Sequence, residues 1–234
     1  VEHYREDPRQ QVIKACERAL KRHAKELAER ERVNDMYELM HELGGDGVVV
    51  GVDEVGRGSV AGPLTVCAVC LPMEPRVWGI NDSKKLTPAR RELLSVKIAE
   101  VATAIGFCHI APKDIDEMGM ARAIRAAVVG AVADTGLEPD CVLMDGNPLG
   151  AVPNERDVVK GDAKIACIAA ASIMAKVTRD EMMVEYDAEY PEYHLAESKG
   201  YASPEHIEAI RKHGLCPLHR VSFCGNFLQT ERLF

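Results

Sequence analysis

The sequence predicts a layered α/β domain built on a mixed sheet. Two apolar runs, residues 48–52 and 64–71, have the composition of strands buried on both faces. A third, shorter run at 140–145 follows a stretch with helical spacing of its apolar residues and ends at a carboxylate. Strands that come first, followed by helices mixed with one more strand, are typical of α/β layering.

The remaining elements follow from local signals. Residues 88–103 are predicted to form a helix that opens with Thr87 as N-cap and Pro88 at its first position. Residues 104–110 suit a third strand, and residues 112–135 suit one or two helices. A long helix is expected from about 163 to 189 and another near 204–213.

The N-terminal stretch differs in composition from the rest of the chain. Residues 8–43 are highly charged with apolar residues at rough helical spacing, and Gly44, Gly45 and Gly47 end the pattern. This predicts one long helix or a helical hairpin broken near Val33 and Asn34. We interpret it as an accessory element packed on the domain, with an arm for a partner or substrate as the alternative. The predicted division is a helical extension, 1–44, and a main domain, 45–234, whose segment from about 190 to 234 is helical.

Composition limits the classes of function. With 47% hydrophobic residues in 234, the chain can bury a sizeable core, which excludes intrinsic disorder. A net charge of −8 and a pI near 5.5 argue against a protein that coats nucleic acid non-specifically. They are compatible with an acidic site neutralised by bound cations, with basic residues nearby.

The cysteines and apolar runs indicate a reduced, cytoplasmic protein. Cys67 and Cys70 form a CxxC, but residues three apart on a strand point to opposite faces and cannot close on one metal. We therefore expect buried free thiols rather than a redox or metal centre. The longest apolar run, 165–175, is too short to span a membrane.

Carboxylates follow two of the predicted strands. Asp53 and Glu54 come after the first strand, and Asp145 ends the strand at 140–145. A carboxylate at the end of a buried strand is costly unless it is solvated, hydrogen-bonded or ligated, and Mg²⁺ prefers such oxygens. Asp162 stands at the predicted start of the long helix, where taken alone it is interpreted as an N-cap.

Glycines surround an arginine next to the first pair of carboxylates. In Gly56-Arg57-Gly58 the glycines let the backbone approach a ligand, and exposed N–H groups can bind phosphate or hydroxyl oxygens. Composition alone would favour a simple turn.

Seven short segments, in order, resemble the motifs of the type 2 ribonucleases H, and of ribonuclease HII in particular. They are GVDEVGRGSVAGPL, NDSKKL, MDGN, VKGD, AASIMAKVTRD, KGYAS and HRVSF, and together they extend over residues 47–223. The resemblance implies an RNase H-like mixed sheet flanked by helices. It implies a metal-dependent endonuclease that cuts on the 5′ side of a ribonucleotide in RNA/DNA hybrids and in duplex DNA, leaving a 3′-hydroxyl and a 5′-phosphate.

Carried over by residue, the resemblance implies a four-carboxylate site for Mg²⁺ or Mn²⁺, made of Asp53, Glu54, Asp145 and Asp162. Whether one or two ions act stays open at this point.

The resemblance also implies that residues 45–234 are the catalytic domain and that the segment from about 190 to 234 binds substrate. Gly56, Arg57 and Gly58 would sense the ribose 2′-hydroxyl, and Tyr201 would stack on the deoxyribose that follows. Basic residues near the motifs are predicted to line a phosphate track: Lys84, Lys85, Lys160, Lys164, Lys176, Arg179 and Lys199. Asp180 lies in a motif too, but its place well down the helix predicts a structural salt bridge.

Arg57 and the helical extension separate this sequence from the sister family, ribonuclease HIII. That family lacks the arginine of the Gly-Arg-Gly segment and usually has a β-rich N-terminal domain, so both features favour HII. Three further hypotheses are an RNase H-fold nuclease without ribose selectivity, a catalytically silent nucleic-acid-binding module, and a metal-free scaffold. The intact set of four carboxylates speaks against the silent module.

The expected partners are RNA/DNA hybrids and ribonucleotide-containing duplex DNA. Residues 229–234 loosely resemble peptides that bind sliding clamps, which makes a clamp a further candidate partner. We expect a monomer.

Overall fold

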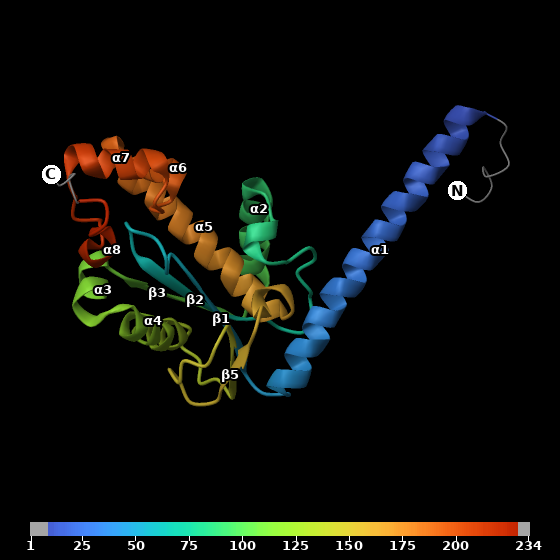
Figure 1. Cartoon of the computed structure of the whole chain (residues 1–234). Helices are drawn as coiled ribbons and strands as arrows, with labels where there is room; N and C mark the ends of the chain where they lie inside the picture. The colour runs from blue at the N-terminus through green and yellow to red at the C-terminus, as the bar shows by residue number, and fades with distance from the viewer. Residues whose placement is uncertain (1–8, 229–234) are drawn as a thin grey trace.

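The computed structural model describes residues 9–228, and within them a five-stranded mixed sheet lies between helices (Figure 1). The strands are β1 (Val49–Val55), β2 (Leu64–Cys70), β3 (Ala104–Ile110), β4 (Cys141–Asp145) and β5 (Glu155–Val158). The helices are α1 (Gln10–Gly44), α2 (Pro88–Val101), α3 (Pro112–Met118), α4 (Met120–Asp134), α5 (Ala166–Glu189), α6 (Leu195–Ser198), α7 (Pro204–His213) and α8 (Val221–Cys224). Three 3₁₀ turns are η2 (Ser83–Lys85), η3 (Gly161–Ala163) and η4 (Pro191–Tyr193).

The sheet has the strand order β3-β2-β1-β4-β5. The first three strands are antiparallel, whereas β4 runs parallel to both β1 and β5. The register of β1 on β4 pairs Val52 with Met144, so the next residue of each strand emerges at the same end of the sheet. The predicted α/β class with a mixed sheet is confirmed.

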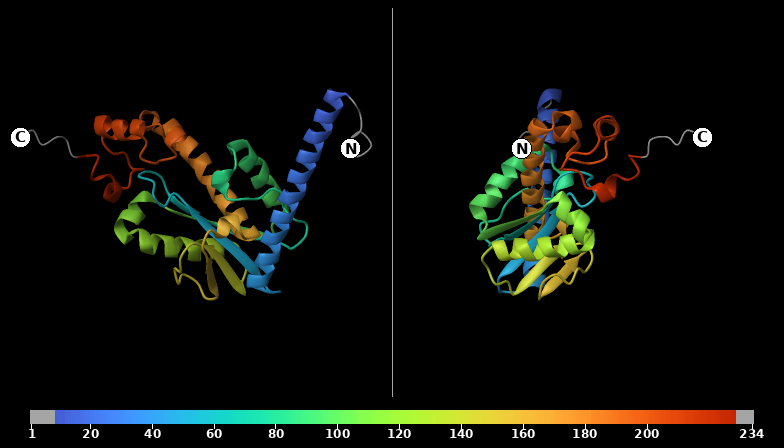
Figure 2. Two further views of the ribbon diagram at one scale, coloured as in Figure 1. Left: turned by 45° about the vertical axis from the view of Figure 1, so that its right-hand side comes forward. Right: turned by 90° about the vertical axis from the view of Figure 1, so that its left-hand side faces the viewer.

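Each face of the sheet has its own core. On one face Val49, Cys67 and Leu143 pack with the apolar side of α5 and with parts of α1 and α2. On the other face Val50 and Cys70, with their neighbours, pack against α3 and α4. The two layers of helices are visible on opposite sides of the sheet in Figures 1 and 2. Cys67 and Cys70 thus lie in different cores, and all eight cysteines are free thiols, as predicted.

Most element bounds agree with the sequence signals. The strand at 104–110 and the helix at 204–213 are confirmed, and Thr87 caps α2 through a hydrogen bond that its side chain accepts from the Arg90 amide. The sequence does not predict the parallel strand β5, because its residues, ERDV, have neither an apolar run nor alternation. The long helix α5 begins three residues later than expected, so the interpretation of Asp162 as its N-cap is wrong.

The N-terminal helix α1 is continuous, so the predicted break near Val33 and Asn34 does not occur. Its buried residues are Val33, Met36, Tyr37 and Met40, all near its C-terminal end. The earlier part stands away from the domain in Figures 1 and 2. The helix is therefore packed on the domain at its base and projects as an arm beyond it. No helix within residues 9–228 is both long and apolar enough to cross a lipid bilayer.

Close packing of α5 on β1 places the end of β1. The first half of α5 is rich in alanine and is buried, from Ala166 to Ile173. Opposite it, β1 has a glycine, and a Cβ at Gly51 would overlap the backbone of Cys167 and Ile168. The absence of a side chain at Gly51 therefore allows the helix backbone to approach the strand that carries Asp53.

We predict that Gly51→Ala destabilises the protein by about 2–3 kcal/mol, because a rigid helix backbone cannot yield to the added methyl group. The measurement is the free energy of unfolding in urea. Gly225→Ala is the matched control, since a Cβ there meets nothing within 4 Å and the backbone is in the right-handed helical region. Equal stability of the two variants would contradict the close-packing argument.

Candidate active site

Two of the predicted carboxylates leave the same face of the sheet. Side chains alternate along a strand, and Val49 of β1 and Leu143 of β4 both face the core under α5. Asp53 and Asp145 are an even number of residues further along these strands, so they point to that same face. Since Val52 pairs with Met144, the two carboxylates start side by side. Glu54, as the next residue on β1, starts toward the other face.

The third carboxylate is brought in by the turn before α5. Asp162 lies in η3 and is buried. The amide of the preceding residue, Gly161, donates a hydrogen bond of 2.7 Å to Oδ1 of Asp145. This bond ties the turn to the end of β4. The sequence motifs around Asp145 and Asp162 therefore meet in space.

Electrostatics shows that these carboxylates influence one another. Burial raises the pKa of Asp53 well above its ordinary value, and the charges of Glu54 and Asp145 raise it further, against a hydrogen bond to Ser172. Burial likewise raises the pKa of Glu54, with the nearby Arg57 opposing and Asp145 adding to the shift. Burial and the charge of Asp145 raise the pKa of Asp162. Each shift means that the negative charge is disfavoured where it lies.

A lysine lies among the carboxylates. Burial lowers the pKa of Lys84, but the charges of Asp53 and Asp162, with smaller effects of Asp82 and Asp145, outweigh it, so that the pKa is raised. The position of Lys84 is fixed locally, because its amide donates a 2.9 Å hydrogen bond to the side chain of Asp82, the N-cap of η2. Lys84 thus contributes a positive charge beside the carboxylates.

The donor set suits a hard divalent cation. Within residues 9–228 no three His, Cys, Asp or Glu side chains are already gathered closely enough to hold an ion. Mg²⁺ does not require such a cage, since it is usually bound through one or two carboxylates, several waters and the phosphates of the substrate. Asp53 and Asp145 supply such a pair, and their mutual repulsion is what a cation would relieve. The residues present therefore fit Mg²⁺ or Mn²⁺.

The Gly56-Arg57-Gly58 segment begins the turn between β1 and β2. Gly56 has φ of 84°, a conformation that favours glycine, and a Cβ there would overlap the guanidinium of Arg179. At Gly58, by contrast, a Cβ would meet nothing within 4 Å. The Arg57 side chain is largely exposed, and its Nη1 lies 3.5 Å from Oε1 of Glu54. Arg57 therefore lies at the surface, next to the carboxylates.

A fully buried arginine from α5 holds this turn. Arg179 donates hydrogen bonds to the carbonyl oxygens of Pro63 (2.9 Å), Ala61 (3.0 Å) and Lys199 (2.8 Å). A fourth bond, of 2.8 Å, goes to the Ser59 hydroxyl, which in turn donates to the Gly56 carbonyl oxygen. The prediction that Arg179 lines a phosphate track is wrong, because its side chain is inside the protein.

The C-terminal segment is attached to the same turn. Arg220, also fully buried, donates to the carbonyl oxygens of Gly62 and Arg57. The amides of Val60 and Ala61 donate to the Gly200 carbonyl oxygen at 2.8 and 3.0 Å. The turn therefore connects the sheet to the segment that carries Tyr201.

Tyr201 lies at a small pocket beside Asp53. The pocket has a volume of about 240 Å³. Its lining residues are Asp53, Glu54, Val55, Ser83, Lys84, Ser172, Lys176 and Tyr201. Tyr201 is 40% exposed, and the Arg179 guanidinium lies 5.8 Å from the centre of its ring. An exposed aromatic face at the rim of an acidic pocket can stack on a sugar or a base.

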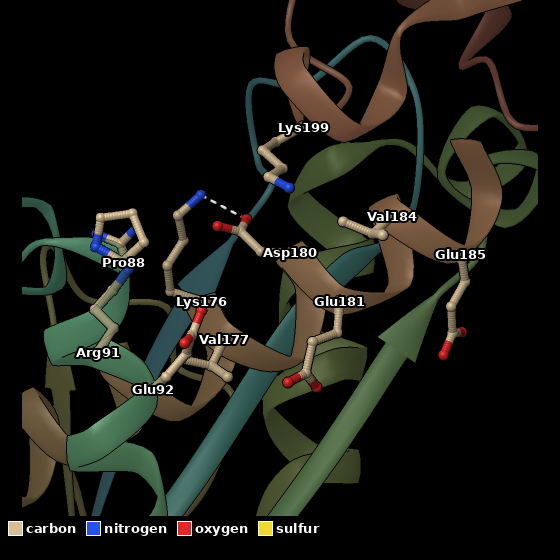
Figure 3. A pocket seen from close by; sticks show the side chains of 10 residues that line it. All are labelled: Pro88, Arg91, Glu92, Lys176, Val177, Asp180, Glu181, Val184, Glu185 and Lys199. Atoms are coloured by element: carbon tan, nitrogen blue, oxygen red, sulfur yellow. Dashed lines mark hydrogen bonds and ion pairs between the residues drawn. The ribbon is translucent and has the colours of Figure 1, made fainter. Parts of the chain in front are cut away.

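The remaining predicted basic residues separate into groups. Lys84 and Lys176 line the site pocket. Lys176 and Lys199 also line an adjoining hollow of about 570 Å³ between α2 and α5 (Figure 3). There Lys176 forms the salt bridge with Asp180, at 2.6 Å, which confirms the structural role predicted for Asp180. Lys160 is exposed and has a left-handed backbone conformation, with φ of 58°. Within residues 9–228, no hydrogen bond or ion pair joins its side chain to the pocket.

Two serines and an aspartate at the site are not predicted from the sequence. The Ser172 hydroxyl donates a 2.9 Å hydrogen bond to the Ser83 hydroxyl, which joins α5 to η2 at the pocket. Asp82 caps η2, and its negative charge contributes to the raised pKa of Asp162. The available signal is their place in the NDSKKL and AASIMAKVTRD segments. Serine at a buried helical position usually only satisfies its own backbone, so residue type alone does not single it out.

We predict that Arg179→Lys lowers the free energy of unfolding by about 2–4 kcal/mol, because one ammonium cannot reach all four oxygens and leaves buried acceptors unpaired. Unfolding in urea measures the loss. Arg122→Lys, an exposed arginine on α4, should change stability by less than about 0.5 kcal/mol. A similar small change at Arg179 would show that the four bonds do not stabilise the turn.

Comparison with known protein families matches nearly the whole chain. The family model for ribonuclease HII matches residues 50–226, and that for the ribonuclease HII N-terminal domain matches residues 1–43. The chain is 42% identical to the ribonuclease HII of Ruminiclostridium cellulolyticum over 221 residues, which cover 93% of this chain and 87% of the relative.

Solved structures share the fold. Ribonuclease H2 from Pyrococcus horikoshii superimposes with a TM-score of 0.65 at 27% identity, over 78% of this chain and 99% of that one. The ribonuclease HII of Archaeoglobus fulgidus, solved in complex with PCNA, gives 0.66 at 24% identity, over 80% and 98%. Bst-RNase HIII in complex with Mn²⁺ gives 0.59 at 18% identity, over 78% and 68%. The chain therefore belongs to the ribonuclease HII family and is a ribonuclease H, an endonuclease that hydrolyses nucleic acid.

Proposed function

We propose that this ribonuclease H cleaves the phosphodiester bond on the 5′ side of a ribonucleotide, in RNA/DNA hybrids and at RNA–DNA junctions in duplex DNA. Cleavage would leave a 3′-hydroxyl and a 5′-phosphate, and it would serve to remove ribonucleotides misincorporated into DNA. The observation that carries the proposal is the placement of Asp53 and Asp145 side by side under α5, joined to Asp162 through Gly161.

The family depends on divalent metal ions, and the roles of the carboxylates follow from their placement. Asp53 and Asp145 would hold Mg²⁺ or Mn²⁺, with Glu54 and Asp162 completing the set. An ion bound there would activate the attacking water and stabilise negative charge on the leaving oxygen. The backbone amide of Glu54 donates a hydrogen bond of 2.8 Å to Oδ1 of Asp53 and holds its carboxylate in place. Lys84 would attract the scissile phosphate into this acidic surrounding.

Selectivity for a ribonucleotide would come from the Gly56-Arg57-Gly58 turn. The 2′-hydroxyl both donates and accepts hydrogen bonds, and it is the group that distinguishes RNA from DNA. The open space at Gly58 leaves room for a sugar to approach the backbone. Tyr201, which lines the same pocket, would stack on the following deoxyribose and disfavour a second hydroxyl there.

The competing hypotheses differ in what they would cleave. An RNase H-fold nuclease without ribose selectivity would cut all-DNA duplex, and a silent binding module would cut neither substrate. The exposed Arg57 beside Glu54 supports a sensor role over a simple turn. The raised pKa values of Asp53, Glu54 and Asp162 support a catalytic site over a scaffold, since unfavourable charges cluster where function requires them.

The decisive assay uses a labelled duplex with one internal ribonucleotide, mapped at nucleotide resolution with and without Mg²⁺. We expect one cut, 5′ of the ribonucleotide, and no cut in the all-DNA duplex. Asp53→Asn should lower the rate by at least about 10³-fold with binding kept, in line with the loss of an electrostatic group at a reacting centre. It should also stabilise the fold by about 1 kcal/mol, or about 2–4 °C, because a buried repelled charge is removed.

The control for that variant is Asp114→Asn, an exposed aspartate on α3, which should leave the rate unchanged and stability nearly so. Cleavage of the all-DNA duplex at a comparable rate would overturn the ribose selectivity. Full activity of Asp53→Asn in saturating Mg²⁺ would overturn the site.

Further expectations rest on the sequence. The last residues, 229–234, lie outside the described residues, and clamp binding through them stays a prediction, supported by the complex of the Archaeoglobus relative with PCNA. Loss of clamp binding on deletion of those residues is its test. A cytoplasmic location, a monomeric state and the division into 1–44 and 45–234 also stay predictions.

A further inference from the structure

The projecting part of α1 is basic in an acidic protein. Residues 10–28 contain five lysines and arginines and two glutamates, a net charge of +3, whereas the whole chain carries −8. Its residues are exposed or only half-buried, since burial in α1 begins at Val33. Figures 1 and 2 show this part away from the sheet, diverging from α5 with α2 between them.

The basic side chains form one stripe along the helix. Lys14, Arg18, Lys21 and Lys25 follow one another at intervals of four, three and four residues, which places them on a single face. Four residues after Lys25 the same face carries Glu29, which is paired with Arg32, and the buried Met36 follows Arg32 by four residues. Arg32 and Met36 lie where α1 packs on the domain, so the basic stripe leads to the edge of the packed side of α1 and ends at the Glu29–Arg32 pair.

The lysines of the stripe are not held in ion pairs. Among the described residues, Lys14, Lys21 and Lys25 form no ion pair within 4 Å, whereas Arg22, at the edge of the stripe, lies 3.8 Å from Glu26. A lysine outside any ion pair on a projecting helix is available to an external anion. The regular spacing makes the stripe match a repeating anionic partner.

A short loop connects the base of the arm to the site pocket. Arg32 donates a 2.6 Å hydrogen bond to the Ile80 carbonyl oxygen, and the Tyr37 hydroxyl accepts one of 2.9 Å from the Val77 amide. Only three residues after Ile80, Ser83 contacts Ser172 in the pocket, and Lys84 follows it. The stripe and the candidate active site are thus joined through one segment.

We infer that the basic stripe of α1 binds the phosphate backbone of the duplex on one side of the cleavage site. The inference rests on the proposed function and extends it to a contact outside the pocket. From Lys14 to Arg32 the helix rises by about 27 Å, which equals about eight base pairs at 3.4 Å each. A duplex bound at Lys84 could therefore continue along the arm with its phosphates near the lysines.

The experiment compares Lys21→Gln/Lys25→Gln with Lys113→Gln/Arg122→Gln, in which two exposed basic residues of α3 and α4 on the opposite face are neutralised. Glutamine keeps the helix propensity of lysine. Affinity for a 30-base-pair all-DNA duplex is measured by fluorescence anisotropy at several salt concentrations. The arm variant should bind about tenfold more weakly and reduce the salt slope by about 1.8, as for two lost phosphate contacts. The control should match the unaltered protein.

Duplex length supplies the positional test. On a duplex with one ribonucleotide and about five base pairs on each side, the arm variant should be cut with unaltered KM and kcat. Two further substrates have one flank extended to about 15 base pairs, which exceeds the roughly eight that the arm spans. The KM of the arm variant should exceed that of the unaltered protein on only one of these two substrates, the one whose long flank lies along the arm. Neutralising Lys14 and Arg18 as well should raise it further. Equal KM values for the arm variant and the unaltered protein on all substrates would overturn the inference.

Two other results are distinguishable. Binding to all-DNA duplex requires no cleavage, so it tests the arm even if the proposed function fails. Ile13, Leu20 and Leu27 recur every seven residues on another face of the arm and would suit a second copy of the chain. A dimer in sedimentation that dissociates on Leu20→Gln, with duplex affinity unaffected by the lysine variants, would assign the arm to self-association and reject the inference.

Discussion

The arrangement of the site depends on the Arg179 guanidinium, which is buried against four uncharged oxygens from separate segments. Through them α5 fixes the turn after β1 and the carbonyl of Lys199 at once. The same helix reaches Asp53 through Ser172 and approaches β1 closely at Gly51. One helix therefore sets the distance between the carboxylates, the Gly-Arg-Gly turn and Tyr201. A charge held by carbonyl dipoles is sensitive to their geometry, so the surrounding backbone has little freedom.

A second buried arginine makes this arrangement costly. Burial and the charge of Arg179 lower the pKa of Arg220 to about 10, so it remains a cation at neutral pH. The carboxylates, which carry charge of the opposite sign, add a further cost, since burial and mutual repulsion raise the pKa values of Asp53 and Glu54. The apolar cores on both faces of the sheet and the alanine-rich half of α5 provide the stability that offsets these terms. Unfavourable charge thus accumulates at the carboxylates and at the two buried arginines that hold the turn beside them.

The sequence allows prediction of what strand and helix periodicity control. The sequence places Asp53 and Asp145 directly after apolar runs, and the parallel pairing of β1 with β4 then brings both to the same edge of the sheet, although β1 continues two residues beyond Asp53. The contribution of Arg179 cannot be predicted in this way, because its motif contains Lys176 and Asp180 at equally plausible positions, and burial of one of them depends on how α5 docks. Strand β5 escapes prediction because pairing with β4, rather than its own composition, makes it a strand. Ser172 and Ser83 meet only through the docking of α5 on η2.

The net charge of the chain is a poor guide to how it meets a polyanion. At physiological ionic strength the screening length is about 8 Å, so a phosphate responds to the groups within roughly that distance. Along α1, Lys25 lies about 10 Å from Arg32 by helical rise, and the carboxylates lie beyond the loop that follows. The acidic site and the basic arm therefore act on different phosphates. Lys84, by contrast, lies close to the carboxylates, because their negative charges raise its pKa. A negative total is then compatible with duplex binding, because the attraction is distributed along the duplex and the repulsion is confined to the point where a divalent ion would bind.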